Sequence, residues 1–157
     1  TTVIKRFLTL WGTKASGFIT EEIREGNIRK GFVIRTLDGI VAPLASVDNT
    51  EAEHKVGKYG IYVENIADVA AGSLLKSGFD ELVIVDEVGK MECLSREFRQ
   101  AIRKIVEGPY KVLGTIAKKG NSFIEKLKKH PGLMIIEVTR ENGDELPIRL
   151  NELLSKG

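Results

Sequence analysis

The sequence contains few of the residues that build disulfides and zinc sites. Cys93 is the only cysteine among 157 residues, so an intrachain disulfide is excluded and the chain fits a reducing compartment. Histidine occurs twice, at His54 and His130, and the spacing of these residues with Cys93 matches no zinc motif. A disulfide-stapled domain and a zinc-binding module are therefore not expected.

Long apolar runs and a large excess of one charge are also missing. No apolar stretch approaches the ~18 residues of a membrane helix, and no signal-peptide pattern is present. We therefore expect a cytoplasmic protein without a membrane-embedded part. The formal net charge of +2 is too small to indicate nucleic acid as a partner. With 42% apolar and 29% charged residues, we expect one globular domain over residues 1–157, as a monomer.

The most informative stretch is a branched apolar run that ends in two carboxylates. Residues 82–85 read LVIV and are followed directly by Asp86 and Glu87. Such a run predicts a strand covered on both faces, and because neighbouring strand residues point to opposite faces, the carboxylates should diverge. At the carboxyl end of such a strand, an Asp can hold Mg²⁺ near nucleotide phosphates, and a following Glu can orient water. A buried strand that merely emerges into an acidic loop explains the same residues, and the spacing alone leaves both interpretations open.

Periodicity and turn residues predict the other elements. Residues 1–11 have the pattern of an amphipathic helix, and residues 15–36 that of an antiparallel hairpin around the loop 25–27. From about residue 66 onward, helices alternate with apolar strands, which predicts parallel βαβ units. The expected helices are 66–76 capped by Asn65, one capped by Ser95, 122–130 and 147–154; the expected strands are 82–85, 111–116 and 133–138. The fold class is therefore α/β, with a mostly parallel sheet flanked by helices and an antiparallel hairpin insertion near the N-terminus.

Four segments resemble the THEP-type nucleoside triphosphatases, also called cancer-related NTPases. They are ASGFITEEIREG from Ala15, KVGKYGIYVENI from Lys55, VIVDEVGKMEC from Val83 and VLGTI from Val112. They occur in the family's order over nearly the whole chain, and the D-E-x-G-K-M-E string is far more specific than a lone strand ending in Asp. The resemblance implies a P-loop NTPase-like fold and Mg²⁺-dependent hydrolysis of ATP, GTP and other nucleoside triphosphates to the diphosphate and phosphate.

The resemblance also implies roles for individual residues. Asp86 would hold Mg²⁺ through water, and Glu87 would orient or activate the attacking water as the catalytic residue. The residues expected to bind the nucleotide are Thr1, Thr2, Asp86, Glu87, Val88, Gly89, Lys90, Met91, Glu92 and Cys93. Four further residues are candidates for lining the site, three from the T-E-E-x-R segment and one near the carboxyl end of the strand 111–116; they are Thr20, Glu21, Arg24 and Thr115.

One motif of the family is absent. The family carries G-x-x-x-x-G-K-[ST] before its first helix, whose backbone N–H groups and Lys bind phosphates, and this sequence contains no such string. Thr1 and Thr2 fall where the motif would end, so Thr1 would take the position of the Mg²⁺-binding hydroxyl. The strand before the motif is central in P-loop folds. We therefore expect that the N-terminal strand and Walker A motif are absent from this chain, which should leave a gap and exposed strand edges.

Other functions remain open at this point. A chain without the phosphate loop fits a non-catalytic nucleotide-binding or regulatory module. Nucleotide and nucleoside kinases share the P-loop core, but they need a lid and an acceptor pocket, and the sequence shows no clear arginine-rich lid. A group of lysines leaves a role with RNA open, although a solvated helix face explains them more simply; they are Lys118, Lys119, Lys126, Lys128 and Lys129.

Overall fold

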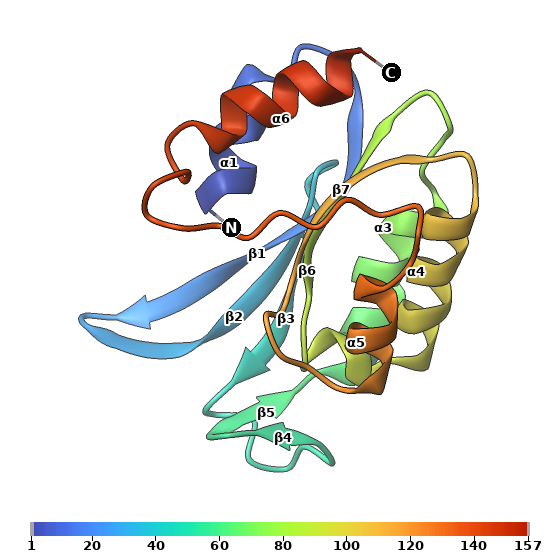
Figure 1. Cartoon of the computed structure of the whole chain (residues 1–157). Coiled ribbons are helices and arrows are strands. Elements are labelled where there is room, and N and C mark those ends of the chain that lie inside the picture. Colours follow the sequence, from blue (N-terminus) through green and yellow to red (C-terminus); the bar gives the residue numbers. More distant parts are fainter. Residues whose placement is uncertain (1, 157) are drawn as a thin grey trace.

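A twisted seven-stranded sheet forms the centre of the molecule (Figure 1). The computed structural model describes residues 2–156, and in it the strands are ordered β4-β5-β3-β2-β1-β6-β7. The strands are β1 (Ala15–Glu25), β2 (Ile28–Thr36), β3 (Val41–Ser46), β4 (Lys55–Val56), β5 (Tyr59–Ile61), β6 (Leu82–Val88) and β7 (Lys111–Ile116). The main helices are α1 (Thr2–Leu10), α4 (Arg96–Glu107), α5 (Ser122–Lys128) and α6 (Leu146–Ser155). The predicted α/β class is confirmed.

The sheet is mixed rather than mostly parallel. Both pairings of β6, with β1 and with β7, are parallel. The pairings β1–β2, β2–β3, β3–β5 and β4–β5 are antiparallel. The expected hairpin is not a separate insertion, because residues 15–18 of β1 pair with β6 while residues 18–25 of the same strand pair with β2. One long strand thus joins the two halves of the sheet, and its far end projects from the body with β2 (Figure 1).

The predicted central strand β6 is covered on both faces, as its branched apolar sequence indicated. Val83 and Val85 belong to a large apolar cluster with Phe98 and Ile102 of α4. Leu82 and Ile84 belong to a second cluster with residues of α1 and α6 (Ile4, Phe7, Leu150 and Leu154). Alternate residues of β6 therefore face two different helical layers, which Figure 1 shows on either side of the sheet. Each buried apolar side chain stabilises the fold by roughly 1.5–3 kcal/mol.

The helix expected at 66–76 begins earlier, and Asn65 does not cap it. The helical stretch comprises α2 (Val63–Asn65), a π-helical turn η1 (Ile66–Ala71) and α3 (Gly72–Leu75). Asn65 lies inside this stretch, and its side-chain amide donates a 2.8 Å hydrogen bond to the carbonyl oxygen of Pro43 on β3. The side chain of Asn65, which the sequence predicted to cap the helix, therefore makes a contact with β3 instead. None of the helices within residues 2–156 is long and apolar enough to span a membrane.

The prediction for the helix after β6 was correct in detail. A short 3₁₀ turn, η2 (Glu92–Leu94), follows the loop after β6 and leads into α4. Ser95 is the N-cap of α4, and its Oγ accepts a 3.1 Å hydrogen bond from the backbone N–H of Phe98. The cap satisfies a backbone donor that a helix start would otherwise leave free. The chain is therefore tied firmly between the end of β6 and the first turn of α4.

The third buried strand predicted at 133–138 does not form. These residues have no regular secondary structure, and Met134, Ile135 and Val138 have 73%, 49% and 54% of their surface exposed. The segment has the apolar composition of a strand but no strand partner among the described residues, because the sheet order ends at β7. A β-strand forms only when it hydrogen-bonds to a neighbouring strand, so the apolar sequence alone was not sufficient to predict one here.

Candidate functional site

The two carboxylates at the end of β6 have different surroundings, as their alternation predicted. Asp86 is 1% exposed, and its Oδ1 accepts a 2.7 Å hydrogen bond from the hydroxyl of Thr115 on β7. Glu87 is exposed and lines a cavity of about 840 Å³. The peptide bond that joins the two residues is cis. One carboxylate is therefore fixed within the sheet, and the other is presented to a space large enough for a nucleotide-sized ligand.

The cavity is built mainly from four parts of the fold, and Ala117, directly after β7, lines it as well. The first turn of α1 contributes Thr2 and Lys5, and the positive end of this helix dipole faces the cavity. The end of β6 and the following turn contribute Glu87 and residues 89–92. The projecting part of β1 supplies a charged wall, and β2, β3 and β4 supply an apolar end; these residues are Thr20, Glu21, Glu22, Arg24, Phe32, Leu44 and Val56. The combination offers partners for phosphates at one end and apolar surface at the other.

The charged side chains of this wall form ion pairs, both within β1 and with neighbouring elements. Glu21 accepts a 2.6 Å hydrogen bond from Arg35 Nε and lies 3.5 Å from Lys5 Nζ. The hydrogen bond from Arg35 and the nearby Lys5 charge hold the pKa of Glu21 below its usual value. Arg24 donates a 2.8 Å hydrogen bond to Glu22. Ion pairs between β1 and its neighbours therefore shape this wall, and Glu21 is poorly suited to act as a base.

Acidic groups around the turn after β6 have raised pKa values. Loss of hydration raises the pKa of Glu87, and the charge of Asp86 adds to the effect. Burial raises the pKa of Glu92 to about 8, and the nearby charges of Glu87 and Asp86 add to the effect. Burial also raises the pKa of the Cys93 thiol to about 12. Cys93 is thus a thiol at neutral pH and is not a nucleophile.

The structure brings most of the predicted site residues together, although their roles stay predictions. Thr2, Glu87, Gly89, Lys90, Met91 and Glu92 line the cavity, as do Thr20, Glu21 and Arg24. Val88 and Cys93, by contrast, are buried in the large apolar cluster. Thr115 acts on the site through Asp86 rather than from the cavity wall. Thr1 lies outside the described residues.

Several cavity residues were missed by sequence reasoning. Lys5 follows Thr2 by three residues, so the helical spacing of α1 carried the signal that the two share a face. The apolar residues Phe32, Leu44 and Val56 come from three strands far from the carboxylates in sequence. Their proximity depends on the long β1 strand that links the sheet halves, and no local pattern indicated it.

The donor chemistry at the end of β6 fits Mg²⁺. Among residues 2–156, no cluster of three or more His, Cys, Asp and Glu side chains forms a ready-made metal site. The Asp86 carboxylate and Thr115 hydroxyl are hard oxygen donors. Mg²⁺ commonly takes one or two carboxylates from a protein and completes its shell with water and substrate phosphates. The site therefore suits a cation that binds together with a phosphorylated ligand, and not an ion held by protein alone.

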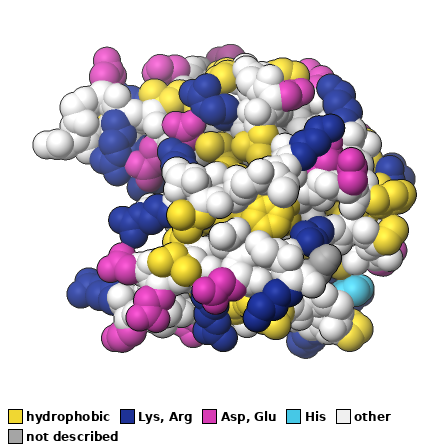
Figure 2. Space-filling model, turned by 90° about the horizontal axis from the view of Figure 1, so that it is seen from above, with side chains coloured by type: hydrophobic (Ala, Val, Ile, Leu, Met, Phe, Trp, Pro, Cys, Tyr) yellow, Lys and Arg dark blue, Asp and Glu magenta, His cyan; other side chains and the backbone are white. Residues whose placement is uncertain are grey.

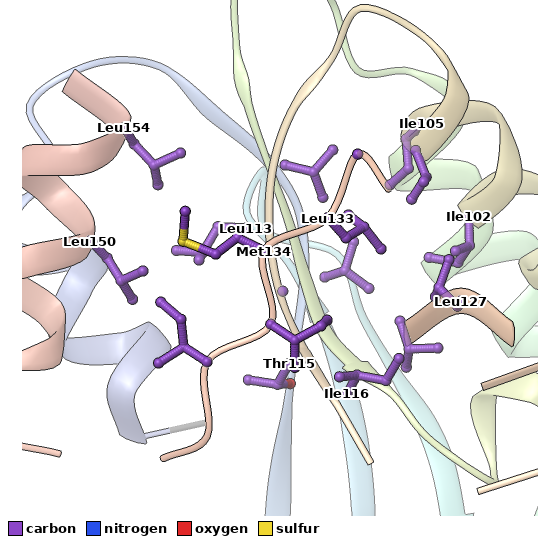
Figure 3. Close-up of a pocket in the computed structure, with 18 of the residues that line it drawn as sticks. Ile102, Ile105, Leu113, Thr115, Ile116, Leu127, Leu133, Met134, Leu150 and Leu154 are labelled. Carbon is purple, nitrogen blue, oxygen red and sulfur yellow. The ribbon is translucent and has the colours of Figure 1, made fainter. Parts of the chain in front are cut away.

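A second hollow lies beside β7 (Figure 3). This groove has a volume of about 390 Å³ and lies between the two helical layers, with Leu150 and Leu154 of α6 on one side and Ile102 and Ile105 of α4 on the other. Its floor and roof come from β7 and from residues 132–136, among them Leu113, Leu133 and Met134. Apolar side chains are exposed in the middle of the face seen in Figure 2, among charged groups of both signs. β7 is the last strand in the sheet order of residues 2–156, so one of its edges has no strand partner there.

One hydrogen bond links a residue of the groove to the end of β6, where the cavity begins. Thr115 lines the groove, and its hydroxyl donates to Asp86, the residue directly before Glu87. An apolar strand that ends in a buried Asp and an exposed Glu, close to the N-terminus of a helix, is the arrangement of a P-loop NTPase-like protein.

Comparison with known proteins defines the family. A family model described as NTPase matches residues 1–151. The chain is 42% identical over 157 residues to nucleoside-triphosphatase THEP1 of Thermotoga maritima, covering 99% of this chain and 87% of that protein. It is 34% identical to the cancer-related nucleoside-triphosphatase homolog of Bos taurus, covering 86% and 78% of the two chains. The chain belongs to this family of nucleoside-triphosphatases.

Solved structures agree with this assignment. The crystal structure of THEP1 from Aquifex aeolicus superposes with a TM-score of 0.89 at 31% identity, covering 98% of this chain and 91% of that chain. The solution structure of a human cancer-related nucleoside triphosphatase gives a TM-score of 0.82 at 28% identity, covering 99% and 91%. The overall path of the chain is thus the same in the bacterial and human relatives.

Proposed function

We propose that this protein hydrolyses nucleoside triphosphates to the diphosphate and phosphate in a Mg²⁺-dependent reaction. Its relatives are named nucleoside-triphosphatases. The observation that carries the proposal is the position of Glu87, which is exposed in a cavity of about 840 Å³ directly after the buried Asp86. A carboxylate in that position can contact a water molecule inside the cavity while its backbone is held at the end of β6.

Asp86 and Glu87 have separate tasks in the proposed reaction. Asp86 would hold Mg²⁺ through water; Thr1, the second ligand predicted from the sequence, lies outside the described residues. Mg²⁺, when bound, neutralises charge on the phosphate oxygens. Thr115 fixes the orientation of the Asp86 carboxylate by its 2.7 Å hydrogen bond. Glu87 accepts a hydrogen bond from the attacking water, and its raised pKa makes it a better proton acceptor than a carboxylate with an ordinary pKa.

Lys5 and the N-terminus of α1 complete the electrostatic setting. Both line the cavity that Glu87 enters, and a helix N-terminus favours anions. The Nζ atom of Lys5 lies 3.5 Å from a carboxylate oxygen of Glu21, so the charge of Lys5 is partly compensated. Arg24 and Lys90 are the other basic residues of the cavity, and Arg24 is paired with Glu22.

We propose that an additional strand in the groove beside β7 brings a phosphate-binding loop to this cavity. The groove is apolar and borders the edge of β7, which suits an extended segment that pairs parallel to β7. In the family the phosphate loop follows such a strand and leads to a helix that corresponds to α1. A strand in this groove would bring the loop close to Thr115 and Asp86.

A non-catalytic nucleotide-binding module is the second candidate, because the sequence lacks G-x-x-x-x-G-K-[ST]. Two measurements on the same preparation separate the candidates: calorimetric titration with a non-hydrolysable GTP analogue, and release of phosphate from GTP in Mg²⁺. Binding together with release supports the enzyme, whereas binding without release supports the module. Product analysis with an added nucleoside would reveal a kinase. The monomeric state and the cytoplasmic location stay predictions from the sequence.

A further inference from the structure

A hollow of about 350 Å³ lies between α4 and α5, on a part of the surface that the proposed reaction does not use. The two helices lie side by side on one face of the sheet (Figure 1). The hollow shares no lining residue with the cavity that contains Glu87. Its volume falls in the range of pockets that hold small organic ligands.

Basic side chains from both helices converge on this hollow. Arg99 and Arg103 are four residues apart on α4, so they lie on the same face of that helix. Lys126 of α5 and His130, just after the end of α5, line the hollow from the other helix. Among the lining residues that the structure describes, Glu107 is the single acidic one. With neutral histidine, the hollow therefore carries three positive charges and one negative charge.

The positive charges of the hollow are not neutralised by acidic side chains of the described chain. Arg99, Arg103 and Lys126 form no ion pair among residues 2–156. By contrast, Arg24 and Arg35 on the projecting strands lie 2.8 and 2.6 Å from carboxylate oxygens. Like charges four residues apart on a helix repel each other, so an anion bound in the hollow would relieve this repulsion.

Both arginines of the hollow are held in place by other contacts. Arg99 Nη1 donates a 2.5 Å hydrogen bond to the carbonyl oxygen of Cys93. The guanidinium carbon of Arg103 lies 5.3 Å from the centre of the Phe123 ring. A guanidinium group has five N–H donors, so each arginine keeps donors for a ligand. Because the two groups are already oriented, binding costs less side-chain entropy than binding to freely moving surface residues.

A neutral donor and an apolar surface complete the hollow. The Nδ1 atom of His130 accepts a 3.0 Å hydrogen bond from the backbone N–H of Gly132, so Nε2 of the neutral ring carries the hydrogen and can donate it. Val106, Phe123 and Leu127 supply apolar surface. A ligand that combines an anionic group with an apolar body would use both kinds of surface.

We propose that the hollow between α4 and α5 binds a small organic phosphate with an apolar body. Arg99, Arg103 and Lys126 hold the phosphate group, because guanidinium groups make paired, charge-assisted hydrogen bonds to phosphate oxygens. The body of the ligand packs against Val106 and Leu127. This inference is independent of the proposed function, since no residue of the cavity takes part.

Phenyl phosphate is the probe, because it joins a phosphate group to an apolar ring. Titrated into the isotope-labelled protein and followed by NMR, it should shift the backbone amide signals of residues 99–107 and 122–130 until saturation. Phenol, which lacks the phosphate, should leave these signals unchanged. Inorganic phosphate should act on the same residues with a higher Kd, because it cannot use the apolar surface. Added salt should raise Kd by screening the charges.

Two double variants with the same loss of charge locate the site. Arg103→Gln with Lys126→Gln alters exposed side chains of the hollow, and Kd for phenyl phosphate should rise by about tenfold or more because hydrogen bonds from charged groups are lost. Arg96→Gln with Lys104→Gln alters exposed side chains of α4 that do not line the hollow, and Kd should stay nearly unchanged. Glu107→Gln removes the acidic side chain and should lower Kd.

Equal losses of binding in the two double variants would overturn the inference, because they indicate diffuse attraction to the surface. Signal shifts confined to the residues that line the cavity of Glu87 would also overturn it. A short single-stranded RNA that binds more tightly than phenyl phosphate, with shifts that extend to Lys118 and Lys119, would overturn the small ligand and assign the surface to nucleic acid. Phosphate release from GTP enters none of these measurements, so failure of the proposed function would be recognised separately.

Discussion

At the scale of single residues, Glu92 makes the stability of the fold depend on pH. Its pKa of about 8 is raised above the value of 4.5 expected in an unfolded chain, so the folded state keeps a proton that the unfolded state releases. Between these two pH values, the free energy of unfolding should fall as pH rises, by up to about 1.4 kcal/mol per pH unit. Below pH 4.5 and above pH 8 this contribution should be flat.

Glu92→Gln removes the titrating group and should flatten this dependence. Urea unfolding at pH 5.5 and 7.5, followed by the fluorescence of Trp11, measures it. We expect the wild type to lose more stability than Glu92→Gln over this range, so that the variant is the more stable protein at pH 7.5. The charges of Glu87 and Asp86 act on this position and are present in both proteins, so the difference between the two proteins reports on Glu92. An identical loss in both proteins would contradict the buried neutral acid.

The sequence alone predicted the surroundings of some site residues but not of others. Asp86 and Glu87 were predictable because a run of four branched residues fixes a strand and the strand fixes their alternation. Glu92 was expected to border the nucleotide, but its burial at 4% exposure was not foreseen. Nothing in the string G-K-M-E shows that the chain folds back on itself at Gly89, so the environment of Glu92 required the structure.

At the scale of elements, the turn between β6 and η2 depends on a single glycine. In Gly89→Ala the new methyl group would meet Glu92 Oε1 at 2.8 Å and Glu87 Cγ at 3.2 Å. Because Glu92 is buried, its carboxyl group has little room to move aside. We expect Gly89→Ala to displace both acids and to lower kcat for phosphate release by on the order of 10²-fold.

Gly72→Ala is the matched control for this change. Gly72 has helical backbone angles, with φ −57° and ψ −41°, and a Cβ at this position meets nothing within 4 Å. Alanine should therefore stabilise the helix by up to about 1 kcal/mol and leave kcat unchanged. Thermal unfolding and phosphate release measure the two effects. A Gly89→Ala protein with the kcat of the control would show that the turn tolerates a side chain.

Elements also show where sequence patterns were sufficient. The helix from Arg96 to Glu107 was predictable because its cap, its apolar stripe and its Gly-Pro end are all local. The segment 133–138 has an equally apolar pattern, yet it forms no strand, because pairing depends on a neighbour that no local pattern specifies. The parallel pairing of β1 with β6 was missed for the same reason.

At the scale of the whole molecule, the groove beside β7 gives a test of the strand proposed to bind there. A synthetic peptide with an apolar strand followed by G-x-x-x-x-G-K-T should bind the protein with 1:1 stoichiometry and raise phosphate release. A peptide in which the loop glycines and lysine are replaced by alanine should bind equally well without raising release. Titration calorimetry and the phosphate assay measure the two effects.

Met134→Lys identifies the groove as the binding site of the peptide. Met134 lines the groove and is 73% exposed, so the substitution should leave the stability of the protein nearly unchanged. A lysine there should weaken peptide binding by about tenfold or more, since burial of a methionine side chain is worth roughly 1.5–3 kcal/mol. Undiminished binding to Met134→Lys, or no binding to the wild type, would rule out the groove as the place of the strand.

The central claim is that Glu87 acts on water beside a bound triphosphate, and the most direct measurement is phosphate release by Glu87→Gln in Mg²⁺ together with its affinity for a non-hydrolysable GTP analogue. We predict that kcat falls by roughly 10²–10⁴-fold, as for loss of a general base, while the affinity is unchanged. Glu51→Gln, which alters an exposed carboxylate that is not among the residues lining the cavity, should match the wild type in both measurements. A Glu87→Gln protein that releases phosphate at the wild-type rate, or that loses affinity and rate equally, would contradict the claim.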